Sequence, residues 1–201
     1  MSESETSEII AVTTRLNMHD TLRARLFNAR TILITGEIDE EMAHEMTEEL
    51  FVLAQDPGEI TLLITSYGGL ADAGGAIIRA IRTAQRAGCA VTGEVRGYAM
   101  SMAALILQSC DVRFVAREDI VMVHGFTGMT VGDVRNTEAD AQMTRRLTKI
   151  YSEFMAERNT SEDEKYHSPA YWRAVLEDSK PNYFFGEEAL ANGLVDSLID
   201  G

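Results

Sequence analysis

The chain has 201 residues, 45% of them hydrophobic and 25% charged, which is the composition of an ordinary globular protein. This length favours a single domain that buries a sizeable core. The formal net charge of −14 argues against nucleic acid as a partner, because phosphate binding requires clustered lysine and arginine side chains. No apolar run approaches the roughly 20 residues that a membrane-spanning helix requires, so we expect no association with a membrane.

The N-terminal residues 1–8 are acidic and polar, the opposite of a basic and apolar secretion signal, so the sequence predicts a cytoplasmic protein. Cys89 and Cys110 agree with this location as two buried thiols whose spacing indicates no zinc site, although a disulfide between them stays open. Residues 1–29 have no strong hydrophobic period and are predicted to form an N-terminal arm. Residues 30–201 are predicted to form one domain.

From residue 30 onward, apolar runs of strand length alternate with segments of helical period. The strands are predicted at residues 31–36, 60–65, 90–95, 112–115 and 120–123. Helices are predicted after the capping residue Asp39, over residues 73–86, and from Ser101 onward. This alternation indicates an α/β fold whose strands are parallel and joined by right-handed crossovers.

The pattern changes after His124. A glycine-rich span, 125–132, leads into a long predicted helix over about 133–158. The apolar stripe of that helix consists of Met143, Leu147, Ile150, Tyr151 and Phe154. A helix of this length can pack on another subunit or within its own domain, and its sequence is compatible with both. A charged loop, a helix from Ser168 and a short helix that stops at Gly193 complete the chain, followed by a last strand.

One serine, Ser101, lies between an extended run and an apolar helical run, among small and apolar neighbours. Such a turn from strand to helix lifts the side-chain oxygen clear of the backbone and points the first free helix N–H groups at the group under attack. His124, at the end of a predicted strand, can serve as its base. The pair Gly68–Gly69 can supply an oxyanion donor. Taken singly, each of these residues has a plainer explanation in packing or in a turn.

These residues belong to four longer motifs. The motifs are Ser66-Tyr67-Gly68-Gly69, Gly97 to Leu107 around Ser101, Met122-Val123-His124, and Glu188-Ala189 with Gly193-Leu194-Val195-Asp196. In this order and spacing, from Leu22 to the C-terminus, the sequence resembles the Clp protease proteolytic subunit. The resemblance implies a crotonase-like α/β fold of repeated ββα units, from which a long handle helix protrudes.

The resemblance also implies an activity and an assembly. Members of the family are serine endopeptidases that carry no cofactor and hydrolyse unfolded polypeptides to short peptides. They form a tetradecamer of two stacked heptameric rings around a closed chamber. A hexameric ATP-driven unfoldase of the Clp type delivers the substrate. We expect the same partners here, while ring size, homo- or hetero-oligomeric composition and cleavage preference stay open.

The resemblance assigns roles position by position. It makes Ser101 the nucleophile and His124 the general base. The backbone N–H groups of Gly69 and Met102 correspond to the pair that holds the oxyanion. The segment Gly125–Gly132 corresponds to the strand that binds the substrate main chain and begins the handle. No residue is expected to bind a metal.

The sequence departs from the family pattern in three places. Tyr67 stands where the family usually has proline, but the two glycines remain, so we expect the turn to form. At the third triad position, where the family has aspartate, gapless counting from Gly193 gives Pro181, which cannot orient a histidine. Asn182 and Asp178 are the nearby alternatives, and the sequence does not choose between them. The N-terminal arm has no close match to the family's axial loop, which leaves the unfoldase open.

Two other functions compete with the peptidase. One is a catalytically inert ring subunit that serves as a scaffold in a mixed complex, which Pro181 favours. The other is an acyl-CoA enzyme of the crotonase type, which shares the fold and the oxyanion glycines. That chemistry usually relies on acidic residues near the oxyanion pocket, whereas Ser101 together with His124 favours peptide cleavage.

Overall fold

The computed structural model describes residues 21–126 and 134–199. Its strands are β1 (Thr31–Ile38), β2 (Glu59–Gly69), β3 (Ala90–Met100), β4 (Val112–Val115), β5 (Ile120–Val123), β6 (Asn182–Phe185) and β7 (Ser197–Leu198). Its helices are α2 (Glu40–Leu53), α3 (Ala71–Arg86), α4 (Met102–Gln108), α5 (Val134–Arg158), α6 (Pro169–Glu177) and α7 (Gly186–Ala191), with a 3-10 helix η1 (Glu164–His167).

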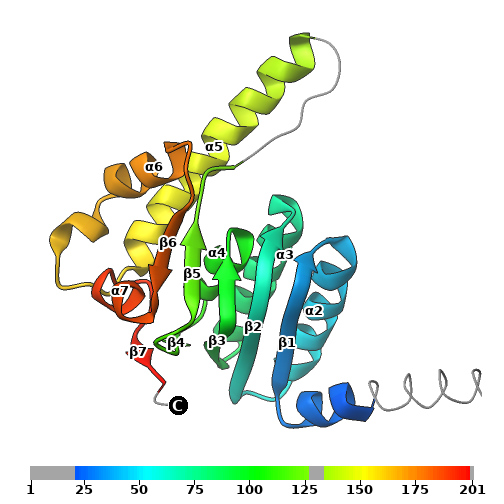
Figure 1. Ribbon diagram of the computed structural model, residues 1–201. Helices are drawn as coiled ribbons and strands as arrows, with labels where there is room; N and C mark the ends of the chain where they lie inside the picture. Colours follow the sequence, from blue (N-terminus) through cyan, green and yellow to red (C-terminus); the bar gives the residue numbers. More distant parts are fainter. Residues whose placement is uncertain (1–20, 127–133, 200–201) are drawn as a thin grey trace, which may run out of the picture.

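The strands form one mixed sheet, and α2, α3 and α4 lie together on one of its faces (Figure 1). Strands β1, β2, β3, β4 and β7 are parallel neighbours in this order. Strand β5 pairs parallel with β3 and antiparallel with β6. The predicted α/β class with mainly parallel strands is therefore confirmed, while β6 and its antiparallel pairing are additions that the sequence pattern did not predict.

The core lies between the sheet and these helices. Alternate strand residues point into it, so that Ile32, Ile34, Ile60, Leu62 and Ile64 are at most 2% exposed. Helix α2 begins where predicted, because the Asp39 Oδ1 accepts the Met42 N–H at 2.9 Å. All seven residues of α4 are buried, which fixes this short helix from every side.

Strands β1, β2 and β3 are longer than predicted, and the extra residues of β2 and β3 form the turn around Ser101. Strand β2 continues past residue 65 to Gly69, and β3 continues past residue 95 to Met100. Pairing with neighbouring strands holds these polar and glycine residues in extended form, with Ser66 opposite Ala99. Hydrophobic period cannot reveal such an extension, because the cause is a partner strand and not the local sequence.

Helix α5 is the long helix predicted over about 133–158, and its first part extends beyond the sheet (Figure 1). The predicted apolar stripe is only partly buried. Tyr151 and Phe154 are buried against the domain, whereas Met143 and Ile150 are each 57% exposed. The helix therefore packs within its own domain through one part of its surface and exposes apolar side chains on another part.

The N-terminal arm predicted over residues 1–29 ends in a helical segment, residues 21–28. Arg23 in this segment contacts two glutamates of α2, Glu45 at 2.8 Å and Glu49 at 3.0 Å. This part of the arm therefore packs on the domain, while residues 1–20 lie outside the described residues.

The cysteine prediction is confirmed, since Cys89 and Cys110 are both free and buried. Within residues 21–126 and 134–199, no helix is both long enough and apolar enough to cross a bilayer.

Candidate active site

Ser101 occupies the turn between the end of β3 and the start of α4. Its backbone has a φ of 54° and a ψ of −120°, a conformation that non-glycine residues rarely adopt. The Ser101 N–H donates to the Met122 carbonyl at 2.8 Å, and the Ser101 carbonyl accepts the Ala104 N–H at 3.0 Å. The hydroxyl does not cap the helix. It therefore stays available, as the strand-to-helix prediction required.

Gly68 makes this turn possible. A Cβ atom at Gly68 would lie 2.7 Å from the Cβ of Ser101 and 2.9 Å from the backbone nitrogen of Met102. Its φ of 98° is also unfavourable for any residue with a side chain. Glycine is thus required here by both space and backbone conformation.

Ser66 holds the glycine turn through hydrogen bonds of its side chain, a role that the sequence did not predict. Its hydroxyl is fully buried, donates to the Gly36 carbonyl at 2.6 Å and accepts the Gly68 N–H at 3.0 Å. The available signal was a serine at the end of an apolar strand directly before a glycine pair. Tyr67, at the usual proline position, is 66% exposed and stacks on Tyr98 with 4.2 Å between ring centroids. The turn forms with tyrosine in this place.

A cavity of about 150 Å³ brings the predicted site residues together. Ser101, His124, Gly69 and Met102 all line it. They come from the ends of three neighbouring parallel strands and from the first turn of α4, as residues at the carboxyl ends of parallel strands do. Met102 is the first residue of α4, where a backbone N–H has no partner within its helix. The remaining part of the predicted substrate strand, residues 127–132, lies outside the described residues.

A second and larger cavity, of about 740 Å³, adjoins the first. The two share four lining residues, His124, Gly125, Phe126 and Leu176. The larger cavity continues between α5 and α6 and the loop that follows α6, and we call it the α5–α6 groove.

Pro181, Asn182 and Asp178, the candidates for the third triad position, differ in whether they line a cavity together with His124. Strand β6 pairs with β5 so that Val123 is opposite Asn182, and the next residues along this register are His124 and Pro181. The strand pairing ends at Val123 and Asn182, and both His124 and Pro181 line the α5–α6 groove. The Asn182 amide donates to the Lys180 carbonyl at 3.3 Å, and Asn182 lines neither cavity of the described structure. Asp178 lines the α5–α6 groove together with His124.

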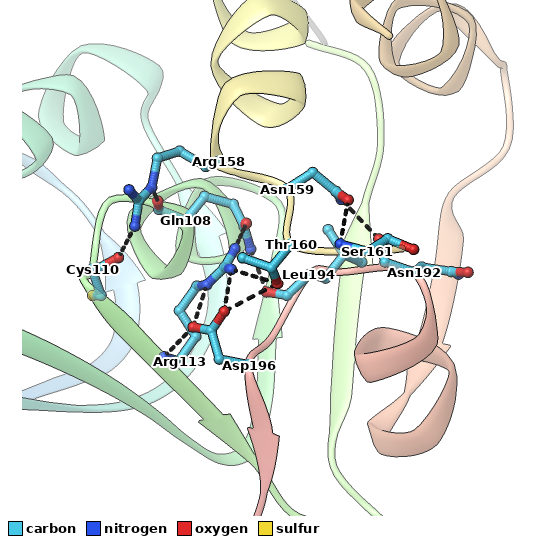
Figure 2. A network of polar contacts seen from close by, with 10 residues as sticks. All are labelled: Gln108, Cys110, Arg113, Arg158, Asn159, Thr160, Ser161, Asn192, Leu194 and Asp196. Carbon is cyan, nitrogen blue, oxygen red and sulfur yellow. Dashed lines mark hydrogen bonds and ion pairs between the residues drawn. The ribbon is translucent and has the colours of Figure 1, made fainter. Parts of the chain in front are cut away.

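A buried polar network holds the other end of α4 (Figure 2). The Arg113 side chain is 1% exposed and binds Asp196 through Nη2 at 2.6 Å and through Nε at 3.0 Å. It also donates to the Gln108 side-chain oxygen and to the Thr160 hydroxyl. Burial by itself raises the pKa of Asp196, but the hydrogen bonds and the charge of Arg113 outweigh burial and lower the pKa below its ordinary value.

The same network reaches the end of α5. Arg158 donates to the backbone carbonyls of Gln108 at 3.0 Å and of Cys110 at 2.5 Å. Gln108, the last residue of α4, donates in turn to the Leu194 carbonyl at 2.8 Å. The C-terminal end of α5, the end of α4 and the C-terminal segment are thus fixed to one another (Figure 2).

A family model described as Clp protease matches residues 14–201. The chain belongs to the Clp protease family. Among its relatives is the ATP-dependent Clp protease proteolytic subunit 2 of Chlamydia trachomatis serovar D, 33% identical over 88% of this chain and 83% of that protein. Another is the ATP-dependent Clp protease proteolytic subunit 3 of Rhodococcus jostii, 31% identical over 92% of this chain and 88% of that protein.

The family predicted from the four motifs is therefore confirmed, and with it a Clp protease fold and membership of a family of peptidases. In this Clp protease Gly69, Ser101 and His124 line one cavity. The family assignment does not by itself assign roles to individual residues.

Proposed function

We propose that this Clp protease is a serine endopeptidase with Ser101 as nucleophile and His124 as general base. The observation that carries the proposal is the 150 Å³ cavity, which Ser101, His124, Gly69 and Met102 line together. A serine with a strained backbone at the entrance of a buried helix is the arrangement that exposes a nucleophilic oxygen.

The reaction follows from these groups. His124 takes the Ser101 proton as the oxygen attacks the peptide carbonyl, and then gives that proton to the leaving amine, which leaves an acyl-enzyme. Water then attacks the acyl group, with His124 again as base, and releases the second product. The Gly69 and Met102 N–H groups bind the oxyanion, and losing one such donor typically slows the reaction about 10²–10³-fold.

Asp178 is the proposed third member of the triad. It ends α6 and lines the same groove as His124, whereas Pro181 offers no acceptor in its side chain. Its Oδ1 accepts the Lys180 N–H at 3.1 Å. A carboxylate has further lone pairs that can accept a hydrogen bond from an imidazole N–H, so the bond to Lys180 leaves Asp178 able to orient His124.

The proposed assembly is a chamber of stacked heptameric rings that receives unfolded polypeptide from a hexameric ATP-driven unfoldase. Two findings support it. The relatives are named proteolytic subunits of ATP-dependent Clp proteases, and α5 exposes Met143 and Ile150 on a helix that extends beyond the sheet. Cytoplasmic location is part of the same proposal.

Labelling with a fluorophosphonate probe tests the chemistry. The probe is expected to modify Ser101 in the assembled particle, and the Ser101→Ala variant to remain unmodified, with native mass spectrometry reporting the ring. Hydrolysis of a fluorogenic peptide that stops on labelling completes the test. Labelling of another residue, or none in an intact ring of native mass, contradicts the proposal.

The second candidate is an inert scaffold subunit, and the feature that favours it is Pro181, which gapless counting puts at the third triad position. It predicts an intact ring in which Ser101 resists the probe even when a catalytically active partner subunit is present. An acyl-CoA enzyme is disfavoured, because among the described residues none that lines the small cavity is Asp or Glu.

A further inference from the structure

The α5–α6 groove lies on the leaving-group side of the proposed reaction. The general base gives its proton to the leaving amine, so the substrate residues that follow the scissile bond lie on the side of His124. His124 lines the groove and Ser101 does not, which places the groove on that side. This step rests on the proposed function.

Three basic side chains line the groove: Arg145 and Lys149 of α5, and Arg173 of α6. The Lys149 Nζ lies 4.0 Å from the Glu153 Oε1. The side chains of Arg145 and Arg173 form no hydrogen bond or ion pair with any other residue of the described ranges. Two unpaired guanidinium groups in one cavity are notable in a chain whose net charge is −14, because acidic partners are abundant on its surface.

The acidic lining residues are concentrated at one end. Glu177 and Asp178 follow Leu176, which lines both cavities and whose carbonyl oxygen lies beside Gly125, the residue after His124. Arg173 precedes Glu177 by one helical turn, about 6 Å along the axis. On α6 the acidic residues therefore lie at the end next to the small cavity, and Arg173 lies one turn away from them. An extended substrate advances about 3.3 Å per residue, so this turn corresponds to about two substrate residues.

We propose that the α5–α6 groove binds a carboxylate of the substrate, on the leaving-group side and beyond the first residue, with Arg145 and Arg173 as the binding groups. Guanidinium is the side chain best suited to hold a carboxylate, because its N–H groups match both oxygens. The carboxylate belongs either to an Asp or Glu side chain or to the C-terminus of a short peptide. The groove then makes cleavage selective for acidic sequence after the cut.

Turnover of matched peptides tests this selectivity. One peptide carries Glu at the second and third positions after the cleaved bond and a C-terminal amide; a second carries Gln there, and a third carries Gln with a free C-terminal carboxylate. We expect kcat/KM to be about fivefold higher for at least one carboxylate peptide than for the neutral one. If the Glu peptide is cleaved faster, the groove binds a side-chain carboxylate. If the third peptide is cleaved faster, the groove binds a C-terminal carboxylate.

The double variant Arg145→Gln/Arg173→Gln should abolish this preference, so that the ratio of kcat/KM between the carboxylate peptide and the neutral peptide falls to about one. Arg146→Gln is the matched control, since Arg146 adjoins Arg145 on α5 but does not line the groove. The preference should also shrink as ionic strength rises from about 50 mM to 500 mM, because exposed charges are screened. Equal turnover of the three peptides, or a preference that survives in the double variant, overturns the proposal.

Binding to the Ser101→Ala variant separates this inference from the proposed function. Fluorescence anisotropy with the same peptides measures the groove without catalysis. Preferential binding of a carboxylate peptide that the double variant loses supports the groove even if Ser101 resists the probe. Equal binding of all peptides refutes the groove while leaving the serine chemistry intact.

Discussion

Replacing Asp196 with asparagine is expected to destabilise the protein strongly. Asp196 accepts hydrogen bonds from both the side chain and the backbone of Arg113, through Oδ1 at 2.6 Å and through Oδ2 at 2.8 Å and 3.0 Å. An asparagine cannot accept all of these bonds, because its NH₂ group is a donor and would face other donors. It also leaves the 1% exposed charge of Arg113 without a counter-charge.

The magnitude follows from burial. Removing one partner of a buried ion pair costs about 3–5 kcal/mol in free energy of unfolding. The Asp196 side chain is 24% exposed, so water compensates in part and we expect the lower end, about 3 kcal/mol. In a domain of this size, 1 kcal/mol corresponds to about 2–4 °C in Tm, which gives a decrease of about 6–12 °C.

The stability that Asp196→Asn loses is larger at neutral pH than at acidic pH. The pKa of Asp196 is lower in the folded protein than in the unfolded chain. Such a carboxyl contributes stability that is fully present above its unfolded pKa of about 3.9 and is lost as the pH falls through the folded pKa. The Tm difference between wild type and Asp196→Asn is therefore complete at neutral pH and shrinks below about pH 4.

Circular dichroism melts of the two proteins between about pH 3 and pH 8 measure both effects. Asp163→Asn is the matched control, because Asp163 forms an ion pair with Lys165 at 2.9 Å but both side chains are more than half exposed. The Asp163→Asn control is expected to have the same Tm as the wild type. The reasoning is refuted if Asp196→Asn melts within 1 °C of wild type, or if its Tm deficit is the same at every pH.

Three further predictions follow from the site. Gly68→Ala should slow labelling of Ser101 at least about 100-fold, because the added Cβ displaces the turn that carries the oxyanion donors. The control is Gly36→Ala, where φ is similar and no atom lies near the added Cβ, and its Ser101 should be labelled at a near-normal rate. Equal rates for the two variants would show that the turn tolerates a Cβ at Gly68. Burial raises the pKa of Cys110 to about 12, so its thiol should resist iodoacetamide in the native protein at pH 8 and react only in denaturant, as peptide mass spectrometry can follow. Asp178→Ala should lower kcat about 10-fold or more without preventing ring formation, and unchanged kcat removes Asp178 from the triad.

Much of the fold could be predicted because the hydrophobic pattern is strong. The strand 120–123, the cap Asp39 and the helix from Ser168 all lie where the sequence predicted them. Strand β6 escaped prediction because it has four half-exposed residues and is held by its pairing with β5. The far ends of β2 and β3 escaped for the same reason, since backbone pairing leaves no trace in side-chain period.

The site was predictable where roles depend on residue type within a motif. Ser101, His124 and the glycine turn line one cavity, although their roles remain a proposal until labelled. Which of Asp178 and Asn182 lies in the same groove as His124 needed coordinates, because Asp178 follows a helix and Asn182 begins a strand. The role of Ser66 needed coordinates, since its two partners include a carbonyl 30 residues earlier.

The strained backbone of Ser101 precedes one end of α4, and the buried network around Arg113 fixes the other end of that helix. A residue with a φ of 54° keeps that conformation only when its surroundings fix it from several directions. The Met122 carbonyl and Gly68 fix the turn itself, while Arg113 and Arg158 fix the far end of α4 through Gln108. Because Arg158 also ends α5, the same hydrogen bonds fix α5 to the helix that begins beside Ser101. Stability of the C-terminal segment and the geometry of the serine thus depend on one short, fully buried helix.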